Sequence, residues 1–419
     1  MATTSIETLK EQIYKWENIG QICDLMIIWA VEMGSSDIHI EPLTNIVRLR
    51  YRVDGALREV LEYQTFLHQQ VVARFKIMSN LKIDEARIPQ DGRISTIINN
   101  KALDLRVSTL PTVHGEKIVM RIVDKSKKIP DLMDLGIEWH NKMLLEKAIA
   151  LPNGIIITSW PTGSGKSTTL YSCLTKLNKP DVNIMTLEDP VENQIDGLNQ
   201  SQMFPDIGYN FAYWLRTALR QDPDIIMVWE IRDHETINIA IEAALTGHLV
   251  VSTIHTNSAA ETITRILNMG IQSFLLPASI NAIIAQRLIR RLCKCKKPVP
   301  MQDLDPAIKA KVEKALKRTA KEELIERIPP EVLQKPVFYE AVGCAECDNI
   351  GYKGRVGIYE ILEITQNIKK MIIEGSSATI INDVAVQDGM ISLEQDGIIK
   401  ALNGKTSLDE VYAAAKENA

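Results

Sequence analysis

A run of small residues that ends in a lysine and a serine has the composition of a phosphate-binding loop. It reads PTGSGKST at residues 161–168 and follows an apolar run at residues 154–159. In such a loop the backbone N–H groups converge on the phosphates of ATP, Lys166 reaches the β and γ oxygens, and the Ser167 hydroxyl ligates Mg²⁺. The candidate ATP-binding residues are Pro161, Thr162, Gly163, Ser164, Gly165, Lys166, Ser167 and Thr168.

The match to the phosphate-loop pattern is incomplete, because Trp160 stands where the pattern has its first glycine. A glycine-rich turn before a helix would have a similar composition. That interpretation gives no reason for the adjacent Lys166 and Ser167 at this spacing, so we predict a nucleotide site.

A second signal is an apolar run that ends in an acid. Residues 222–233 read DPDIIMVWEIRD, and Glu230 follows the apolar part. A carboxylate at the end of such a strand lies beside the Mg²⁺ and the attacking water of an NTPase, so we predict that Glu230 orients water and, with Ser167, holds Mg²⁺. An acid at a solvated strand end would give the same pattern. The distance of Glu230 downstream of Lys166 favours the catalytic interpretation.

The elements that must position these residues indicate an α/β core. Continuous apolar runs are typical of strands buried on both faces of a parallel sheet, and here they alternate with helical stretches. Strands are expected at residues 154–159, 184–187, 224–228 and 249–254, and helices at residues 166–178, 211–221, 234–246 and 258–269. A third, helical portion is expected to follow, interrupted by a charged stretch at residues 303–335.

The first part of the chain has a different pattern. Alternating runs at residues 46–53 and 102–107, together with the pairs Asp54-Gly55 and Asp91-Gly92, predict an α+β domain with a meandering sheet joined by Asp-Gly turns. A lysine-rich, proline-containing segment then marks a linker. We expect an N-terminal domain at 1–125, a linker at 126–135 and an ATPase domain at 136–419.

Composition sets limits on the class of protein. The chain has 419 residues, 45% hydrophobic and 24% charged, as in a soluble globular protein of two or three domains. Its net charge of −5 and its lack of long basic blocks argue against binding of nucleic acid. No apolar window approaches the ~20 residues of a membrane span and the start lacks signal-peptide order, so a cytoplasmic protein with reduced or metal-bound cysteines is expected.

Two close cysteine pairs predict a structural metal site. Four thiolates from Cys293, Cys295, Cys344 and Cys347 would form a closed tetrahedral site for Zn²⁺. The first pair is C-x-C rather than the usual C-x-x-C, so four unmetallated thiols stay an alternative. The other two cysteines, Cys23 and Cys173, fall in apolar helical stretches and are expected in the core.

Over nearly its whole length the chain resembles the secretion ATPases of type II secretion and type IV pilus assembly. The phosphate loop is one of several motifs that carry the resemblance. The others are GSSDIHIEP at 34–42, RIPQDGR at 87–93, TLEDPVE at 186–192, EIRD at 230–233, and a histidine box with GH at 247–248 and STIHTN at 252–257. The resemblance implies a RecA-like P-loop NTPase core that carries a tetracysteine element, at about 293–347, and C-terminal helices.

The resemblance also implies roles for further residues. Glu192, with Glu188 and Asp189, would organise the metal and water, and His255 would contact the γ-phosphate. A lone histidine at a strand end is more often a satisfied structural residue, but its spacing after the Glu230 strand favours function.

Arginines of the N-terminal domain are implied to complete the nucleotide site. Arg93 and Arg106 are the principal candidates, with Arg87 and Arg121 behind them. A guanidinium at the developing γ-phosphate charge accelerates phosphoryl transfer in other NTPases. Arginines on a solvated sheet face are the alternative, since arginine is mostly exposed.

In function, the resemblance implies a homohexameric motor at the cytoplasmic face of the inner membrane, attached there through partners. It would use ATP and Mg²⁺ to turn a platform protein and add pilin subunits to a fibre, without nucleic acid. The cysteine pairs favour assembly or secretion over pilus retraction, because retraction-type relatives generally lack them. A catalytically inactive scaffold is the rival from another class.

Tryptophan is unusually placed in this chain. Trp160 and Trp229 stand where the family has glycine, and Trp139 and Trp214 stand where it often has glycine or another small residue. The chain has six tryptophans and only 21 glycines, so its share of glycine is below the usual ~7%. Either the ATPase is degenerate, or UGA codons that the source organism reads as glycine have been translated as tryptophan; we favour the second interpretation.

Overall fold

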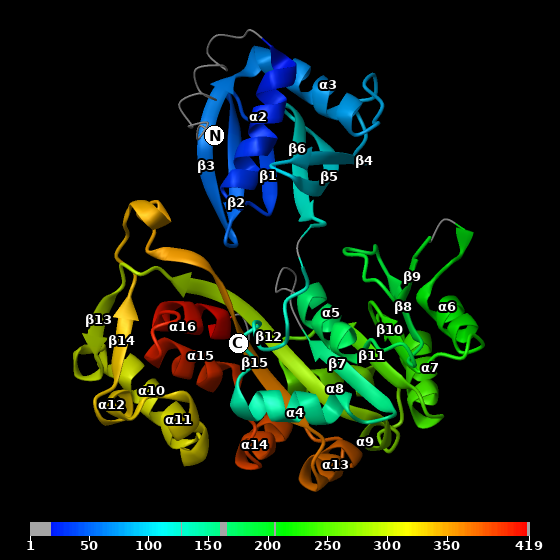
Figure 1. The fold of residues 1–419 in the computed structure, drawn as a ribbon, viewed down its shortest axis with the longest axis vertical. Helices are drawn as coiled ribbons and strands as arrows, with labels where there is room; N and C mark the ends of the chain where they lie inside the picture. The colour runs from blue at the N-terminus through cyan, green and yellow to red at the C-terminus, as the bar shows by residue number, and fades with distance from the viewer. Residues whose placement is uncertain (1–17, 127, 160–165, 205–206, 417–419) are drawn as a thin grey trace. The chain divides into compact units, whose positions relative to one another are not determined.

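A computed structural model describes residues 18–126, 128–159, 166–204 and 207–416. The chain divides into two compact units, Met1–Lys128 and Ile129–Ala419, which are described separately (Figure 1). Among the described residues, no helix is both long and apolar enough to cross a membrane.

In its described residues, the first unit is an antiparallel sheet with two α-helices. Its strand order is β3-β2-β1-β6-β5-β4. Along strands such as β2, every second residue is buried. These apolar side chains face a core that α2 and α3 also fill. The elements are α2 (Ile19–Glu32), β1 (Asp37–Pro42), β2 (Ile46–Val53), β3 (Ala56–Gln64), α3 (His68–Met78), β4 (Gln90–Ile98), β5 (Lys101–Thr112) and β6 (Gly115–Asp124).

The two Asp-Gly pairs have different roles. Asp54 and Gly55, both at positive φ, form the predicted two-residue turn between β2 and β3. The expectation of a turn at Asp91-Gly92 is wrong, because both residues pair within β4. Gly92 is required there for close approach, since a Cβ would lie 2.5 Å from the carbonyl oxygen of Ser79.

The second unit is built on a seven-stranded sheet of order β15-β12-β7-β11-β10-β8-β9 (Figure 1). Neighbouring strands from β12 to β9 are parallel, and β15 pairs antiparallel with β12. The strands are β7 (Gly154–Ser159), β8 (Ile184–Glu188), β9 (Asn199–Gln202), β10 (Ile225–Val228), β11 (Leu249–Ile254), β12 (Ile280–Leu292) and β15 (Tyr352–Glu363). The predicted parallel α/β core is confirmed.

Helices cover both faces of this sheet. Ile156 of β7 packs in one apolar cluster with α4 and α5, whereas Ile155 and Ile157 pack in another with α6, α7, α8 and C-terminal helices. The first helices are α4 (Trp139–Ile149), α5 (Lys166–Leu177), α6 (Phe211–Ala218), α7 (His234–Leu245), α8 (Ala259–Asn268) and α9 (Leu276–Ser279). The later ones are α10 (Pro306–Lys317), α11 (Lys321–Arg327), α12 (Pro330–Gln334), α13 (Gln366–Ile373), α14 (Ala378–Gln387), α15 (Leu393–Leu402) and α16 (Leu408–Lys416).

The chain after the core contains strands as well as the expected helices. Its two long strands, β12 and β15, extend the central sheet, and a small hairpin of β13 (Lys297–Pro300) and β14 (Val337–Glu340) lies between them in sequence. Most of β12 is buried, so its apolar run lacks the period-two alternation that identifies a strand.

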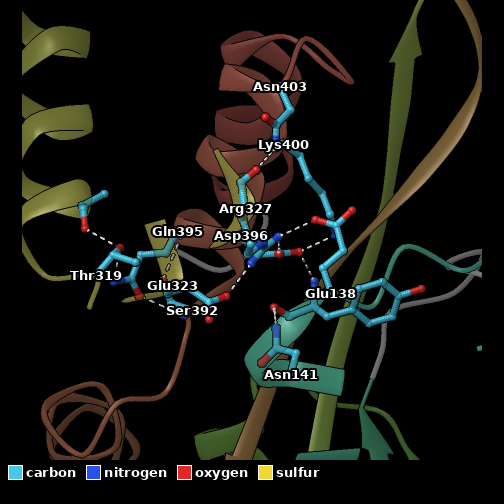
Figure 2. Close-up of polar contacts among 12 residues, drawn as sticks. Glu138, Asn141, Thr319, Glu323, Arg327, Ser392, Gln395, Asp396, Lys400 and Asn403 are labelled. Atoms are coloured by element: carbon cyan, nitrogen blue, oxygen red, sulfur yellow. Dashed lines mark hydrogen bonds and ion pairs between the residues drawn. The ribbon is translucent and has the colours of Figure 1, made fainter. Parts of the chain in front are cut away.

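A buried ion network joins the C-terminal helices to the start of this unit (Figure 2). Asp396 of α15 accepts hydrogen bonds from Lys400 Nζ at 2.7 Å and Arg327 Nη2 at 2.5 Å, and from the backbone N–H of Tyr359 at 2.8 Å. Arg327 also contacts Glu138, which precedes α4, at 3.1 Å. Burial would raise the pKa of Asp396, but Lys400 and Arg327 hold it below its usual value.

Part of the segment predicted as a linker packs against the second unit. The carbonyl oxygen of Pro130 accepts a hydrogen bond from Ser172 Oγ at 2.6 Å, and that of Leu135 accepts one from the Tyr359 hydroxyl at 3.0 Å. Leu132 between them is buried. Residues 130–135 are therefore part of the ATPase unit.

The first prediction concerns the buried network. Asp396→Asn is expected to lower the free energy of unfolding by about 3–5 kcal/mol, because Arg327 and Lys400 lose their shared counter-charge. Denaturant unfolding at neutral pH measures the loss. The control Glu374→Gln affects an exposed ion pair with Lys370, 3.9 Å apart, and should cost at most about 1 kcal/mol. Equal losses in the two variants would contradict the prediction.

The second prediction concerns Trp139, whose φ of 39° lies in the left-handed region that favours glycine. Trp139→Gly and Trp139→Ala both remove the indole, but alanine keeps a Cβ in this conformation. The glycine variant should therefore be more stable than the alanine variant by about 1 kcal/mol, measured by thermal unfolding. An alanine variant at least as stable as the glycine variant would exclude a glycine-specific conformation.

Candidate active site

The predicted catalytic residues gather at the carboxyl edge of the parallel sheet. Adjacent strands β7, β11, β10 and β8 run in the same direction, so their carboxyl ends meet at one edge. Ser159 ends β7 and Glu188 ends β8, whereas Glu230 lies two residues after β10 and His255 directly after β11. Parallel α/β sheets bind their ligands at this edge.

Glu230 lies at the centre of this arrangement. Its carboxylate is buried, with Oε2 at 2.6 Å from Nε2 of His255 and Oε1 at 2.5 Å from Nε of Arg232. The same arginine lies 3.8 Å from Asp189, the residue after β8. Glu230 and His255, which the sequence predicted as separate site residues, are therefore in direct contact, and Arg232 fixes the orientation of the acid.

A second contact joins the start of α5 to the TLEDPVE segment, residues 186–192. Ser167 Oγ donates a hydrogen bond to Glu192 Oε2 at 2.9 Å. The backbone N–H of Glu192 in turn donates to the hydroxyl of Tyr171, one turn further along the same helix, at 3.3 Å. A hydroxyl beside a carboxylate is a donor set that suits Mg²⁺.

Glu188 is in a different environment from its neighbours. Its carboxylate accepts hydrogen bonds from the Tyr171 hydroxyl, from Thr186 Oγ1 at 2.7 Å and from Gln200 Nε2 at 3.0 Å. Burial raises the pKa of Glu188, and these donors act in the opposite direction. The side chain is thus a buried link between α5, β8 and β9.

The loop that carries His255 is attached to the strand before the phosphate loop. Ser159 Oγ lies 2.6 Å from Thr256 Oγ1 and donates to the backbone carbonyl of Thr256 at 2.9 Å. On the other side, the N–H of Ile231 donates to Thr253 O at 3.0 Å. The histidine loop is therefore tied to β7, and strand β11 before it is tied to the segment after Glu230.

Part of the predicted phosphate loop lies outside the described residues. This applies to Trp160 and to Pro161, Thr162, Gly163, Ser164 and Gly165. The described chain resumes at Lys166, which begins α5, and Thr168 lies in its first turn. Strand β7 and helix α5 are the elements that a phosphate loop joins.

In the N-terminal unit the arginines form a row. Arg106 of β5 lies directly opposite Arg93 of β4 and Arg121 of β6, so all three side chains project from one face of the sheet. Arg121 Nε donates to Asp37 at 3.2 Å. Arg87 lies outside this row and pairs with Glu85 at 2.9 Å.

All four predicted zinc ligands converge. The four sulfur atoms lie within 4.8 Å of one another, with separations of 3.8 Å for Cys293 and Cys344, 3.8 Å for Cys295 and Cys347, and 3.7 Å for Cys344 and Cys347. A tetrahedron with zinc–sulfur bonds of about 2.3 Å has edges of about 3.8 Å, so the cluster fits Zn²⁺. The C-x-C spacing does not prevent this geometry.

Hydrogen bonds to sulfur support the same interpretation. The backbone N–H groups of Cys344 and Gly351 both donate to Cys347 Sγ at 3.2 Å. Burial alone would raise the pKa of Cys347, but these donors lower it to about 6 and so favour the thiolate. Cys23 and Cys173 are buried in apolar clusters, as predicted.

Sequence reasoning assigned no role to Arg232, Tyr171 or Gln200. Arg232 lies two residues after Glu230, and this spacing in the EIRD motif was an available signal. Tyr171 and Gln200 reach Glu188 from other elements, and nothing in their local sequence indicates the contact.

A lysine and serine that open a helix after a central parallel strand, beside strand ends that carry an acid and a histidine, define a P-loop nucleoside triphosphatase. The chain matches the family described as Type II/IV secretion system protein over residues 15–413 and belongs to that family.

Relatives of known name agree with this membership. The chain is 45% identical over 417 residues to the type IV pilus assembly ATPase PilB of Myxococcus xanthus, covering 97% of this chain and 71% of PilB. It is 43% identical over 401 residues to the type II secretion system ATPase E of Vibrio cholerae, covering 96% of this chain and 76% of that protein. The crystal structure of the pilus retraction motor PilT with bound ADP is similar at a TM-score of 0.60 and 25% identity, covering 93% of this chain and 96% of PilT.

The third prediction tests the cysteine cluster. Purified chain is expected to contain bound zinc, and Cys347→Ser should lose most of it because a closed structural site needs all four thiolates. Elemental analysis after dialysis against a weak chelator measures the metal. Cys173→Ala, which removes a buried thiol outside the cluster, should retain zinc. Zinc content unchanged in Cys347→Ser would exclude the site.

Proposed function

We propose that this chain is an ATP-driven motor that powers assembly of a type IV pilus or a type II secretion pseudopilus. The contact between Glu230 and His255 at the sheet edge, 2.6 Å apart, is the observation that carries the catalytic part of the proposal. Family membership and the similarity to PilB and ATPase E support the biological part.

In the proposed site the residues divide the work of phosphoryl transfer. The backbone of residues 161–165 and the ammonium of Lys166 hold the phosphates. Glu230 orients the attacking water, and His255 contacts the γ-phosphate. The adjacent acid Glu192 organises metal and water, which agrees with its hydrogen bond to Ser167. In the transition state of phosphoryl transfer, negative charge spreads over the phosphate oxygens. Groups that are already positioned to stabilise this charge accelerate the reaction.

The metals have separate tasks. Mg²⁺ would be held by Ser167 and Glu230 and would neutralise phosphate charge when ATP is bound. Zn²⁺ would be held by the four clustered cysteines and would stabilise the fold around β13 and β14. Arg93 and Arg106 of the N-terminal unit are proposed to complete the nucleotide site when the two units close.

At the level of the assembly, we propose a homohexamer that acts on a platform protein at the cytoplasmic face of the inner membrane. Hydrolysis would change the angle between the two units of each subunit. The cysteine cluster favours assembly over retraction, because assembly-type members carry such a site and retraction-type members generally lack it. Peripheral attachment would come through protein partners, and nucleic acid is not required.

The fourth prediction tests the catalytic proposal. Glu230→Gln is expected to lower the kcat of Mg-ATP hydrolysis about 100-fold or more, because the amide cannot orient water as a carboxylate does, while Mg-ATP still binds. Lys166→Ala should instead weaken nucleotide binding. Phosphate release and equilibrium binding of a fluorescent ATP analogue measure the two effects.

Both variants should be made in a chain with glycine at Trp160 and Trp229. The matched control is Glu374→Gln, an exposed carboxylate on a different surface, which should leave hydrolysis unchanged. Hydrolysis that survives in Glu230→Gln would exclude the role proposed for Glu230, whereas hydrolysis that is absent from the glycine-restored parent would favour the inactive scaffold.

A further inference from the structure

The histidine loop, residues 255–258, is held by two buried charged side chains that lie on the long C-terminal strands of the sheet. Arg287 of β12 binds the backbone of this segment at Asn257, and Glu360 of β15 binds the backbone of Ala259 directly after it. We propose that Arg287 and Glu360 are positioning residues for ATP hydrolysis, which hold His255 in contact with Glu230. The proposal rests on the catalytic role proposed above for His255.

The exposure of His255 explains why its backbone needs such support. Its side chain is 45% exposed, so packing does not fix the ring, whereas Glu230 opposite it is only 6% exposed. The position of the imidazole therefore depends on the backbone of the loop. A displacement of about 1 Å in a catalytic group can lower a rate about 100-fold, so small movements of this loop matter.

Arg287 supports the centre of the loop. Its side chain is buried in the sheet, and Nη2 donates a hydrogen bond to the carbonyl oxygen of Asn257 at 2.6 Å. Nη1 donates to the carbonyl oxygen of Gln286 at 2.9 Å, which fixes the guanidinium plane. A charged donor to a buried carbonyl makes a stronger hydrogen bond than a neutral one.

Glu360 supports the end of the loop. Its Oε1 accepts a hydrogen bond at 3.0 Å from the N–H of Ala259, the first residue of α8. Its Oε2 accepts one at 3.3 Å from the N–H of Leu393, the first residue of α15. One buried carboxylate thus binds two helix N-termini, where negative charge is stabilised by the unpaired N–H groups and the helix dipoles.

The two side chains complete the attachment of the loop. Thr256 is bound to Ser159, Asn257 to Arg287, and Ala259 to Glu360. His255 is the residue of this stretch that projects toward Glu230. Loss of either charged support should therefore move the imidazole without removing any group that the proposal places on the nucleotide.

The fifth prediction is a double-mutant cycle in the full chain with glycine at Trp160 and Trp229. Arg287→Met and Glu360→Gln should each lower kcat about 10-fold or more, with KM for ATP changed less than about 2-fold. Arg287→Lys, which keeps a charged donor, should recover most of the lost rate. In a His255→Ala background, neither Arg287→Met nor Glu360→Gln should lower kcat further, because residues that act through one group are not additive.

Measurements of binding and stability separate positioning from damage to the fold. Stoichiometric binding of a fluorescent ATP analogue and thermal unfolding report the folded fraction, and kcat is expressed per bound nucleotide. The control is Glu410→Gln, which disturbs another carboxylate bound to β12, through Arg290 at 2.5 Å. It should leave kcat unchanged. If Glu360→Gln does not fold, the cycle of Arg287→Met with His255→Ala, together with the recovery expected for Arg287→Lys, decides alone.

Two results would overturn the inference in distinguishable ways. If His255→Ala lowers kcat and the support variants lower it by the same factor in both backgrounds, they act independently of His255, and the proposed function survives without the inference. If His255→Ala has no effect on kcat, the role proposed for His255 is wrong, and the positioning proposal falls with it.

Discussion

The parallel alignment of the central strands is the constraint on which the site depends. Because β7, β11, β10 and β8 run in one direction, residues that lie far apart in sequence end at the same edge of the sheet. The buried faces of these strands supply the apolar contacts that hold the alignment. At this edge Ser159 of β7 contacts Thr256 of the loop after β11, and Glu230 after β10 contacts His255 of the same loop.

Most of the parallel core could be predicted from sequence, and so could the residues at its edge. The strands at 154–159 and 249–254 have the predicted bounds, because each is a short apolar run between polar or glycine residues. Strands β12 and β15 were missed for a different reason: each has a stretch of consecutive buried residues, which gives no period-two alternation in the sequence. The sequence predicted that Ser167 and Glu192 belong to the same site, but it did not predict the hydrogen bond between them.

The supporting groups could not have been predicted from local spacing. Glu360 contacts a backbone group 101 residues away, and Asp396 contacts an arginine 69 residues away. Such contacts depend on how β15 and α15 pack on the core, which no motif encodes. The local sequence also does not show whether a charged residue is buried or exposed, because its burial depends on partners elsewhere in the chain. The sequence therefore indicated the groups that do chemistry more clearly than those that hold them.

Helix α15 connects these supports to the rest of the ATPase unit. Its N-terminus binds Glu360, which also binds the end of the histidine loop, and its next turns carry Asp396 and Lys400 of the buried network (Figure 2). Moving α15 relative to the sheet would break charged hydrogen bonds in a medium where unpaired charges are costly. One buried side chain, Glu360, therefore holds both the N-terminus of α15 and the residue that follows the histidine loop, so the C-terminal helices help to fix the backbone next to His255.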